Sequence, residues 1–231
     1  MFSIIIPTYN EACRIAATIK SAQSVSATHE TEIIVVDGGS SDDTVLIAEQ
    51  CGATVVKSNR KGRATQMNAG AAMAKHEILC FVHADSALPN GFGARIALAK
   101  SKGAKSGCFR LRFDHPHWFL KANAWLTRFD VNAVRFGDQS LFARKDVFNA
   151  SGGYREDLLM MEDQEIIHRL KQLGKFEVMD DYVVTSARKY IDNGIYRMQF
   201  VFYRLWTMYY LGYSQEHMLA VYRRLVRQHN L

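Results

Sequence analysis

The sequence predicts an α/β protein with a mostly parallel sheet, helices on both faces of the sheet, and a helical extension at the C-terminus. Short runs of β-branched and other apolar residues alternate with helical stretches through the first two thirds of the 231 residues. These runs are apolar at successive positions, which is typical of strands covered on both faces. Aromatic residues recur every three or four positions near the end of the chain, which is a helical period.

Four short strands are expected in the first half, separated by helices. The expected strands are Ser3–Ile6, Glu32–Asp37, Thr54–Val56 and Ile78–Val82. Pro7 should end the first strand, because proline has no N–H to donate to a ladder. The expected helices are Glu11–Ala22, a helix from Ser41 or Asp42 to Cys51, and Arg63–Ala74.

The second half has a less regular pattern. An alternating strand is expected at Cys108–Phe113, an aromatic helix at His117–Phe129, a further strand at Asp138–Ala143, and an amphipathic helix at Glu162–Leu173. No repeat or low-complexity linker divides the chain. We therefore expect one domain over residues 1–187, followed by an extension over residues 188–231.

The extension is basic and aromatic. It carries seven basic and two acidic residues, so it holds most of the net charge of +6 of the whole chain. A helix at Tyr196–Tyr213 that is apolar on all sides is normally buried, here against the domain or a second copy in a homodimer. Arg197 and Arg204 interrupt it too early for a transmembrane span. Peripheral contact with an anionic membrane through this helix stays open, and no recognised motif points to nucleic acid.

Composition excludes several protein classes. A hydrophobic fraction of 48% and a charged fraction of 23% fit a soluble globular protein rather than a disordered chain. The four cysteines show no CxxC spacing, so neither a zinc site nor a disulfide framework is expected. The N-terminus lacks the basic start and long apolar run of a signal peptide. A cytoplasmic protein is expected, either free or at the inner face of the membrane.

Polar side chains follow three of the predicted strands, where ligands bind in parallel sheets. The segments are Pro7–Glu11, Asp37–Ser40 and His83–Ser86. Asp37 can accept hydrogen bonds from a base or a ribose, and Gly38 lets a ligand approach the backbone. Asp42 and Asp43 are expected to cap the helix that follows.

Charged residues farther along the chain suit a phosphorylated ligand. Arg60, Lys61 and Arg63 precede a helix and suit a diphosphate, although a solvated basic loop would look the same. Asp85 ends a strand and can hold Mg²⁺ or Mn²⁺ against a nucleotide diphosphate. Glu162 and Asp163 begin a helix, either as partners of its dipole or as a general base.

Five motifs in this order resemble the family 2 glycosyltransferases of GT-A fold, which have a Rossmann-like sheet. The motifs are SIIIPTYNE, IIVVDGGSSDDT, GRATQMNAG, FVHADS and GGYREDLLMMEDQEIIHRL, and they extend from Ser3 to Leu170. The segment TSARKY with the aromatic tail is also similar to a small bacterial subgroup that is grouped with radical-SAM and selenium-related proteins and linked to arsenosugar biosynthesis.

The resemblance implies roles for individual residues. Asp163 matches the catalytic base of the Glu-Asp motif, and Asp85 matches the last, metal-binding acid of the Asp-x-Asp motif. His83 replaces the first acid of that motif, so it is a second metal ligand, a ribose contact or a packing group. Arg188 would face the phosphates. The remaining nucleotide-sugar contacts that the resemblance implies are Pro7, Tyr9, Asn10, Glu11, Asp37, Gly38, Arg63 and Asn68.

The predicted function is inverting, metal-dependent glycosyl transfer from a nucleotide-diphosphate sugar to an acceptor hydroxyl. UDP is the expected nucleotide, Asp163 the general base, and the acceptor is unknown. One alternative is a nucleotide-sugar-binding or scaffold protein, which the change to His83 favours. The other is a nucleotidyltransferase, which would normally carry a Gly-rich basic loop where Pro7–Glu11 has neither Gly nor Lys.

Overall fold

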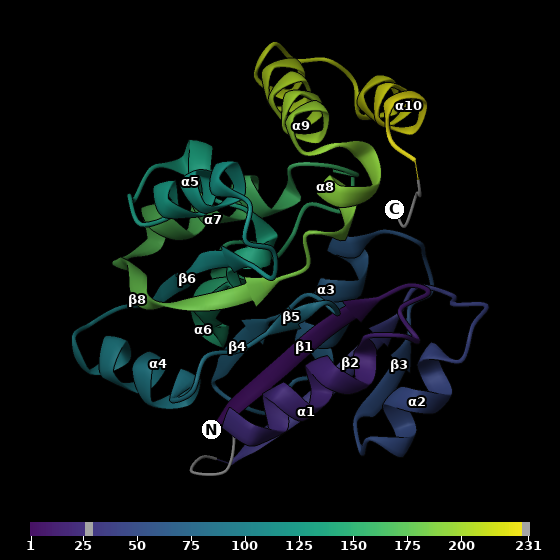
Figure 1. The fold of residues 1–231 in the computed structure, drawn as a ribbon. Helices are drawn as coiled ribbons and strands as arrows, with labels where there is room; N and C mark the ends of the chain where they lie inside the picture. Colours follow the sequence, from purple (N-terminus) through teal and green to yellow (C-terminus); the bar gives the residue numbers. More distant parts are fainter. Residues whose placement is uncertain (26–29, 228–231) are drawn as a thin grey trace.

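A curled sheet with helices on both faces forms the centre of the protein (Figure 1). The computed structural model describes residues 1–25 and 30–227. In this part of the chain the strand order is β3-β2-β1-β4-β7-β6-β8-β5, and only the pairings made by β7 and β5 are antiparallel. The mostly parallel α/β fold expected from the sequence is therefore confirmed. The strands are β1 (Phe2–Thr8), β2 (Thr31–Asp37), β3 (Thr54–Lys57), β4 (Ile78–Phe81), β5 (Ser86–Ala87), β6 (Ser106–Phe113), β7 (Phe142–Arg144) and β8 (Phe176–Thr185).

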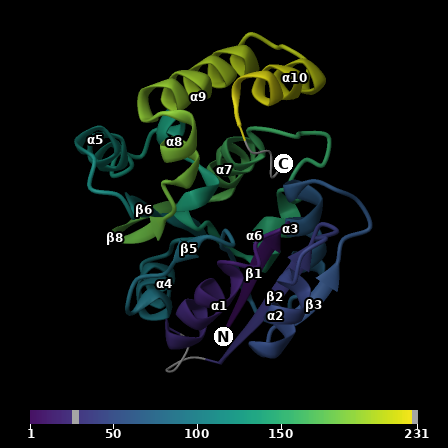
Figure 2. The same cartoon turned by 45° about the vertical axis from the view of Figure 1, so that its right-hand side comes forward.

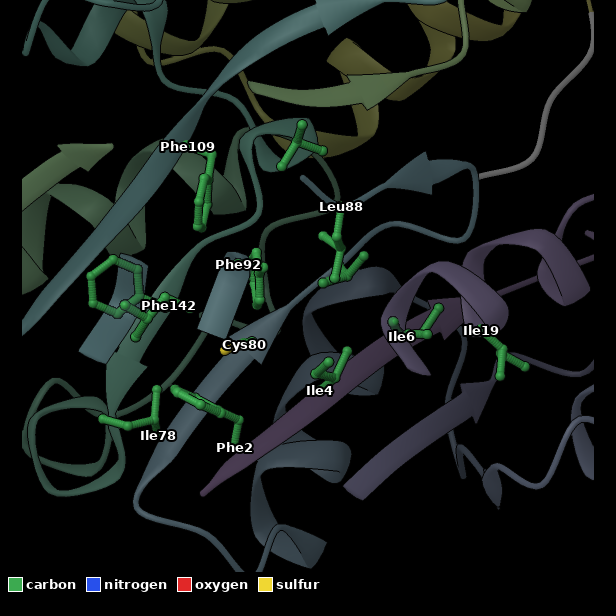
Figure 3. Packing of buried hydrophobic residues seen from close by; sticks show 14 of the residues in the cluster. Phe2, Ile4, Ile6, Ile19, Ile78, Cys80, Leu88, Phe92, Phe109 and Phe142 are labelled. Atoms are coloured by element: carbon green, nitrogen blue, oxygen red, sulfur yellow. The ribbon is translucent and has the colours of Figure 1, made fainter. Parts of the chain in front are cut away.

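Two hydrophobic cores lie on opposite faces of the sheet, because β1 is apolar at successive positions. Ile4 and Ile6 pack into the core beneath α1 (Ile15–Val25), α2 (Thr44–Gln50) and α4 (Phe92–Ser101) (Figure 3). Ile5 points the other way, into the core beneath α3 (Arg63–Met73), α6 (Lys145–Ala150) and α7 (Glu162–Leu173). Burial on both faces fixes the register of β1, since a slip by one residue would exchange the two sets.

Two predictions about local structure were wrong. β1 continues through Pro7 to Thr8, because β4 pairs with β1 only as far as Ile5 and leaves that side of Pro7 without a ladder. A strand from Asp138 was also expected, but Gly137–Gln139 forms a 3-10 turn and β7 begins only at Phe142. Ser140 takes a left-handed conformation with φ of 50°, which breaks the extended chain between them.

Three helices follow the sheet at the C-terminal end: α8 (Arg188–Asn193), α9 (Ile195–Tyr210) and α10 (Gln215–Leu225) (Figure 2). Residues 228–231 of the predicted extension lie outside the described residues. The inner faces of α9 and α10 bury Leu205 and Tyr222 in a third hydrophobic cluster, together with Met160 from the loop before α7. The extension is thereby packed on the sheet domain.

Burial of α9 on all sides, which its composition favoured, does not occur. Met198, Val201 and Leu205 face the third cluster, but Phe200 on the other side keeps 65% of its surface exposed. Among the described residues, no helix combines the length and the apolar character needed to cross a bilayer. The helix α5 (Trp118–Leu126) and the short turn Asn132–Val134 complete the described elements.

Candidate active site

The loops after β1 and β2 are joined into one wall at the C-terminal ends of the strands. The backbone N–H of Asn10 donates to Oγ of Ser40 over 2.9 Å, and the backbone N–H of Ser41 donates to Oδ1 of Asn10 over 2.8 Å. Asn10 has a left-handed φ of 53°, which asparagine tolerates better than most residues. The neighbouring Pro7 is buried in β1, and Tyr9 is half-buried beneath the Lys61 ammonium.

Asp37 shapes the second loop with its own carboxylate. Its oxygens accept hydrogen bonds from the backbone N–H of Gly39 over 3.0 Å and from that of Ser40 over 3.1 Å. A nucleoside contact of Asp37 would therefore add to bonds already made within the loop. Gly38 lies against the Gln66 amide, which would be 3.0 Å from any added Cβ.

Helix capping after this loop differs in part from the expectation. The carboxylate of Asp42 accepts from the backbone N–H of Thr44 over 3.1 Å and from that of Ala12 over 3.2 Å. Asp43 occupies the N-cap position, but its side chain makes no capping hydrogen bond. Asp42 therefore satisfies the helix start, and it also ties the first loop to the second.

Arg63 contacts the acidic pair at the start of α7. Its Nε lies 2.5 Å from Oε1 of Glu162, and its Nη2 lies 3.6 Å from Oδ2 of Asp163. Although burial opposes the charge, the two carboxylates raise the pKa of Arg63. Asn68, on the same helix, uses its amide on the backbone of Tyr154, with both bonds at 2.8 Å. The structure therefore brings Arg63 to the acids, whereas Asn68 holds the loop before α7.

The carboxyl group of Asp163 lies in a setting that suits a general base. It is only 9% exposed. Burial and the neighbouring charge of Glu162 raise the pKa of Asp163 to about 6, while Arg63 and His83 act in the opposite direction. A carboxylate with this pKa is ionised at neutral pH and is a stronger base than an ordinary aspartate.

Asp138 is a site residue that sequence reasoning missed. Its Oδ1 lies 2.6 Å from Nδ1 of His83, the residue in place of the first acid of the Asp-x-Asp motif. Against the effect of burial, this hydrogen bond raises the pKa of His83 and lowers that of Asp138 to about 2. No sequence pattern indicated this pair, because Asp138 lies in a segment that was predicted as a strand.

His83 and Asp163 meet at Gly137. A Cβ built on Gly137 would lie 2.6 Å from Nε2 of His83 and 2.3 Å from Oδ2 of Asp163. Nε2 of His83 is buried and makes no hydrogen bond within the described residues. A side chain at position 137 would therefore displace the His83 imidazole or the Asp163 carboxylate, which border one small space.

Asp138→Asn is expected to lower the pKa of His83, because the charged hydrogen-bond acceptor on Nδ1 would be lost. The titration can be followed by NMR of the imidazole protons, with the exposed His217 of α10 as an internal reference in the same spectra. An unchanged His83 pKa in Asp138→Asn would contradict the ion pair.

A second cluster of charged side chains includes Asp85, Arg188 and Glu11. The guanidinium of Arg188 binds the carboxylate of the buried Glu11, and its Nη2 lies 3.6 Å from Oδ2 of Asp85. Burial and the charge of Asp138 raise the pKa of Asp85, although His83 and Arg188 act in the opposite direction. The loop after β1, the end of β4 and the start of α8 thus meet at one point.

The protein offers few ligands to a divalent cation. Within residues 1–25 and 30–227, no group of three or more His, Cys, Asp or Glu side chains is placed to hold a metal ion. Asp85 supplies one carboxylate, while His83 is directed to Asp138. Mg²⁺ commonly binds through one or two carboxylates together with substrate phosphates and water. The residues therefore fit a cation that is held mainly by the phosphates of a bound nucleotide.

A groove of about 640 Å³ lies beside α5, along the ends of β6 and β8. Arg112, Lys121, Trp125 and Tyr182 are among its lining residues. At one end, Oδ1 of Asp114 accepts a hydrogen bond from the backbone N–H of Ala187 over 2.7 Å, directly before Arg188. Asp114, which lines the groove, thus contacts the residue that precedes Arg188 in the chain.

Residues 3–150 match the family model of glycosyl transferase family 2. The chain belongs to this family. The matched residues are more than half of the chain and include the β1, β2 and β4 loops, Arg63, His83, Asp85 and Asp138. The family that the sequence resembled is thereby confirmed.

Curated relatives of this family 2 glycosyltransferase carry the same general description. An uncharacterised glycosyltransferase of Rickettsia felis is 38% identical over 86 residues, which are 37% of this chain and 29% of that protein. An uncharacterised glycosyltransferase of Mycobacterium tuberculosis is 27% identical over 177 residues, which are 72% of this chain and 67% of that protein. The chain thus spans under a third of the first relative.

Solved structures show the same fold at low sequence identity. S. aureus TarS in complex with UDP is 19% identical, with a TM-score of 0.67 over 80% of this chain and 60% of that one. The mannosyltransferase PcManGT of Pyrobaculum calidifontis, in complex with GDP-Man and Mn²⁺, is 19% identical, with a TM-score of 0.70 over 88% of this chain and 61% of that one. The GT-A fold that was expected from the sequence is therefore confirmed.

Proposed function

We propose that this family 2 enzyme transfers a sugar from a UDP-sugar to an acceptor hydroxyl with inversion at the anomeric carbon, and that Asp163 is the general base. The observation that carries the proposal is the buried Asp163 carboxylate, whose pKa is raised to about 6 beside Glu162 and Arg63. The UDP bound to TarS and the UDP-GlcNAc complex of the same protein support a uridine nucleotide.

The proposed reaction is a single displacement. The acceptor oxygen forms a bond to the anomeric carbon, its proton passes to Asp163, and the bond from that carbon to the diphosphate oxygen breaks. The leaving diphosphate keeps the electron pair. Because the acceptor attacks from the face opposite the leaving group, the configuration inverts. Arg63 keeps Asp163 oriented, and general-base catalysis of this kind contributes about 10²–10⁴-fold to a rate.

The leaving diphosphate needs positive charge beside it. A divalent cation, Mg²⁺ or Mn²⁺, held by Asp85 and the donor phosphates would neutralise the negative charge that grows as the bond breaks. Arg188 lies 3.6 Å from Asp85 and supplies a second positive charge at the same place. The Mn²⁺ bound in PcManGT and in glucosyl-3-phosphoglycerate synthase of Mycobacterium tuberculosis supports this part of the proposal.

The acceptor would enter along the groove beside α5, whose aromatic and basic lining suits a sugar or an anionic aglycone. The segment Thr185–Tyr190 with the aromatic helices supports a narrower assignment, to the subgroup linked to arsenosugar biosynthesis. A cytoplasmic location is part of the same proposal.

Binding of UDP provides the direct test of the donor site. Isothermal titration with UDP is expected to show binding in Mn²⁺ or Mg²⁺ that weakens in EDTA, because the cation joins Asp85 to the phosphates. Asp85→Ala is expected to bind weakly in all three conditions and to lose the metal dependence. Failure of UDP, GDP and the other nucleoside diphosphates to bind with or without metal would contradict a nucleotide-sugar donor.

A nucleotide-sugar-binding protein without turnover is the second candidate, and one observation favours it. His83 stands in place of an acid and is directed to Asp138 rather than to Asp85. Tight metal-dependent binding of UDP-sugars, without release of UDP during long incubation with any acceptor or with water, would support this candidate over the transferase.

The rate of UDP release is expected to fall below pH 6. Asp163 must be ionised to accept a proton, and its pKa is about 6. Below that pH the ionised fraction, and with it kcat/KM, should fall about tenfold per pH unit. The affinity for UDP over the same pH range separates this effect from loss of donor binding. A carboxyl group with a pKa of about 6 changes its ionisation between about pH 4.5 and 7. If kcat/KM stays constant over this range, Asp163 is not the base.

A further inference from the structure

Exposed aromatic side chains of α5 and α9 form one continuous surface, which we call the aromatic face. The rings of Trp118 and Tyr196 lie 6.4 Å apart between centroids, and those of Phe119 and Tyr196 lie 4.9 Å apart, so the two helices share this surface. Figure 1 shows both helices on the same side of the sheet. Its exposed members are Trp118, Tyr196, Phe200, Tyr203 and Tyr210.

Packing within the chain does not account for this face. Trp118 is 63% exposed and Phe200 is 65% exposed, although the opposite side of α9 is fully used in the third hydrophobic cluster. Tyr196, Phe200 and Tyr203 are spaced four and three residues apart, which places them on one side of the helix. Grouped exposed apolar side chains of this size mark a place where something else binds.

Basic side chains accompany the aromatic ones. Lys121 and Arg128 lie on or next to α5, and Arg197 and Arg204 lie on α9. Within the described residues, none of these four forms an ion pair with a carboxylate. The face is therefore both aromatic and positively charged.

The charge selects among possible occupants. In a symmetric dimer the same patch meets itself, so the basic side chains of α9 would face their own copies. An anionic surface has the complementary charge. Tyrosine and tryptophan rings with arginine and lysine beside them are the side chains that settle at the boundary between lipid headgroups and acyl chains.

We propose that the aromatic face docks the protein onto the surface of an anionic lipid bilayer. The rings of Trp118, Phe200 and Tyr203 would enter the headgroup layer, and Arg204 would lie against lipid phosphates. Arg188 begins α8 in the charged site, and α9 follows after Gly194. Docking would therefore hold the site next to the membrane surface. The proposal does not depend on the proposed reaction.

Co-sedimentation of the full chain with vesicles tests the proposal. One set is phosphatidylcholine alone, and the other contains about one third phosphatidylglycerol, which gives the surface a negative potential. Binding is expected only with phosphatidylglycerol and should weaken at about 0.5 M salt, where charges are strongly screened.

Two variants test the two parts of the face. Phe200→Ser is expected to weaken binding about tenfold, because a large apolar side chain no longer leaves water. Arg204→Glu should weaken it by more than about fivefold, because an attractive charge is replaced by a repulsive one. The matched controls are Leu98→Ser on α4, where Leu98 is 47% exposed, and the exposed Lys20→Glu on α1; both should bind like the unchanged protein.

Three results would overturn the proposal. They are no binding to phosphatidylglycerol vesicles, equal weakening by the control variants, and a dimer in sedimentation velocity that Phe200→Ser dissociates. Circular dichroism and UDP titration on each variant show that the fold and the donor site are unchanged, so loss of vesicle binding is not confused with unfolding.

Discussion

Asp163→Asn is expected to lower the rate of sugar transfer by about 10²–10⁴-fold, while the affinity for UDP stays close to that of the unchanged enzyme. Asparagine has nearly the same size and keeps an oxygen atom at the place of Oδ2, which lies 3.6 Å from Nη2 of Arg63. It has no basic oxygen to take the proton from the acceptor. The loss should therefore be in kcat and in kcat/KM alike, as for a group that acts only in the transition state.

The matched control is Asp157→Asn, an aspartate whose side chain is 63% exposed and paired with Arg155 at the surface. It should keep full activity. Initial rates of UDP release and isothermal titration with UDP separate catalysis from donor binding. A parallel loss of UDP affinity and rate in Asp163→Asn would mean that Asp163 maintains the donor site instead of acting as the base.

Gly137→Ala should have the second large effect. The added methyl group would lie 2.3 Å from Oδ2 of Asp163 and 2.6 Å from Nε2 of His83, so one or both side chains must move. A displacement of about 1 Å at a reacting group can lower a rate by about 10²-fold. Overpacking of a buried site also costs about 1–3 kcal/mol of folding stability. We expect a folded but less stable protein with a strongly reduced kcat.

Gly70→Ala separates these two effects. Its methyl group would lie 2.4 Å from Cγ2 of Ile5, in the core between α3 and β1. A similar decrease in stability is expected there, with kcat per folded molecule largely retained. Thermal unfolding followed by circular dichroism measures the stability, and UDP release at a temperature well below both transitions measures kcat. Wild-type kcat in Gly137→Ala would show that the space between His83 and Asp163 is not part of the reaction.

Local patterns were sufficient to predict most of the sheet. Consecutive apolar residues marked β1, β2 and β4, since a strand buried on both faces has no polar alternation. The helix α7 was predicted with its observed bounds, because its amphipathic period ends at Gly174. The helix α4, the strand β8 and the helix α10 were not predicted. β8 is half-buried for most of its length, with Asp180 and Asp181 near its middle, so its composition resembles a surface segment.

For the candidate site, sequence reasoning proposed residues but not the contacts between them. Glu162, Asp163 and Asp85 were chosen from motif and position, whereas their partners come from distant parts of the chain. Arg63 and Glu162 are 99 residues apart, and Arg188 and Glu11 are 177 residues apart. No period or propensity encodes such pairs. Asp138 was missed because its segment was expected to be a strand. The left-handed Ser140 that breaks this strand cannot be recognised from a single sequence.

The bond between Arg188 and Glu11 has a consequence for how this protein can be cut or recombined. Arg188 is the first residue of the predicted extension, yet its guanidinium binds a buried carboxylate at the opposite end of the sequence. Truncation after residue 187 would leave Glu11 as an uncompensated buried acid and would remove a cation from the proposed donor site. A chimera that takes its terminal helices from another protein should therefore keep a cation at position 188 opposite the acid at position 11.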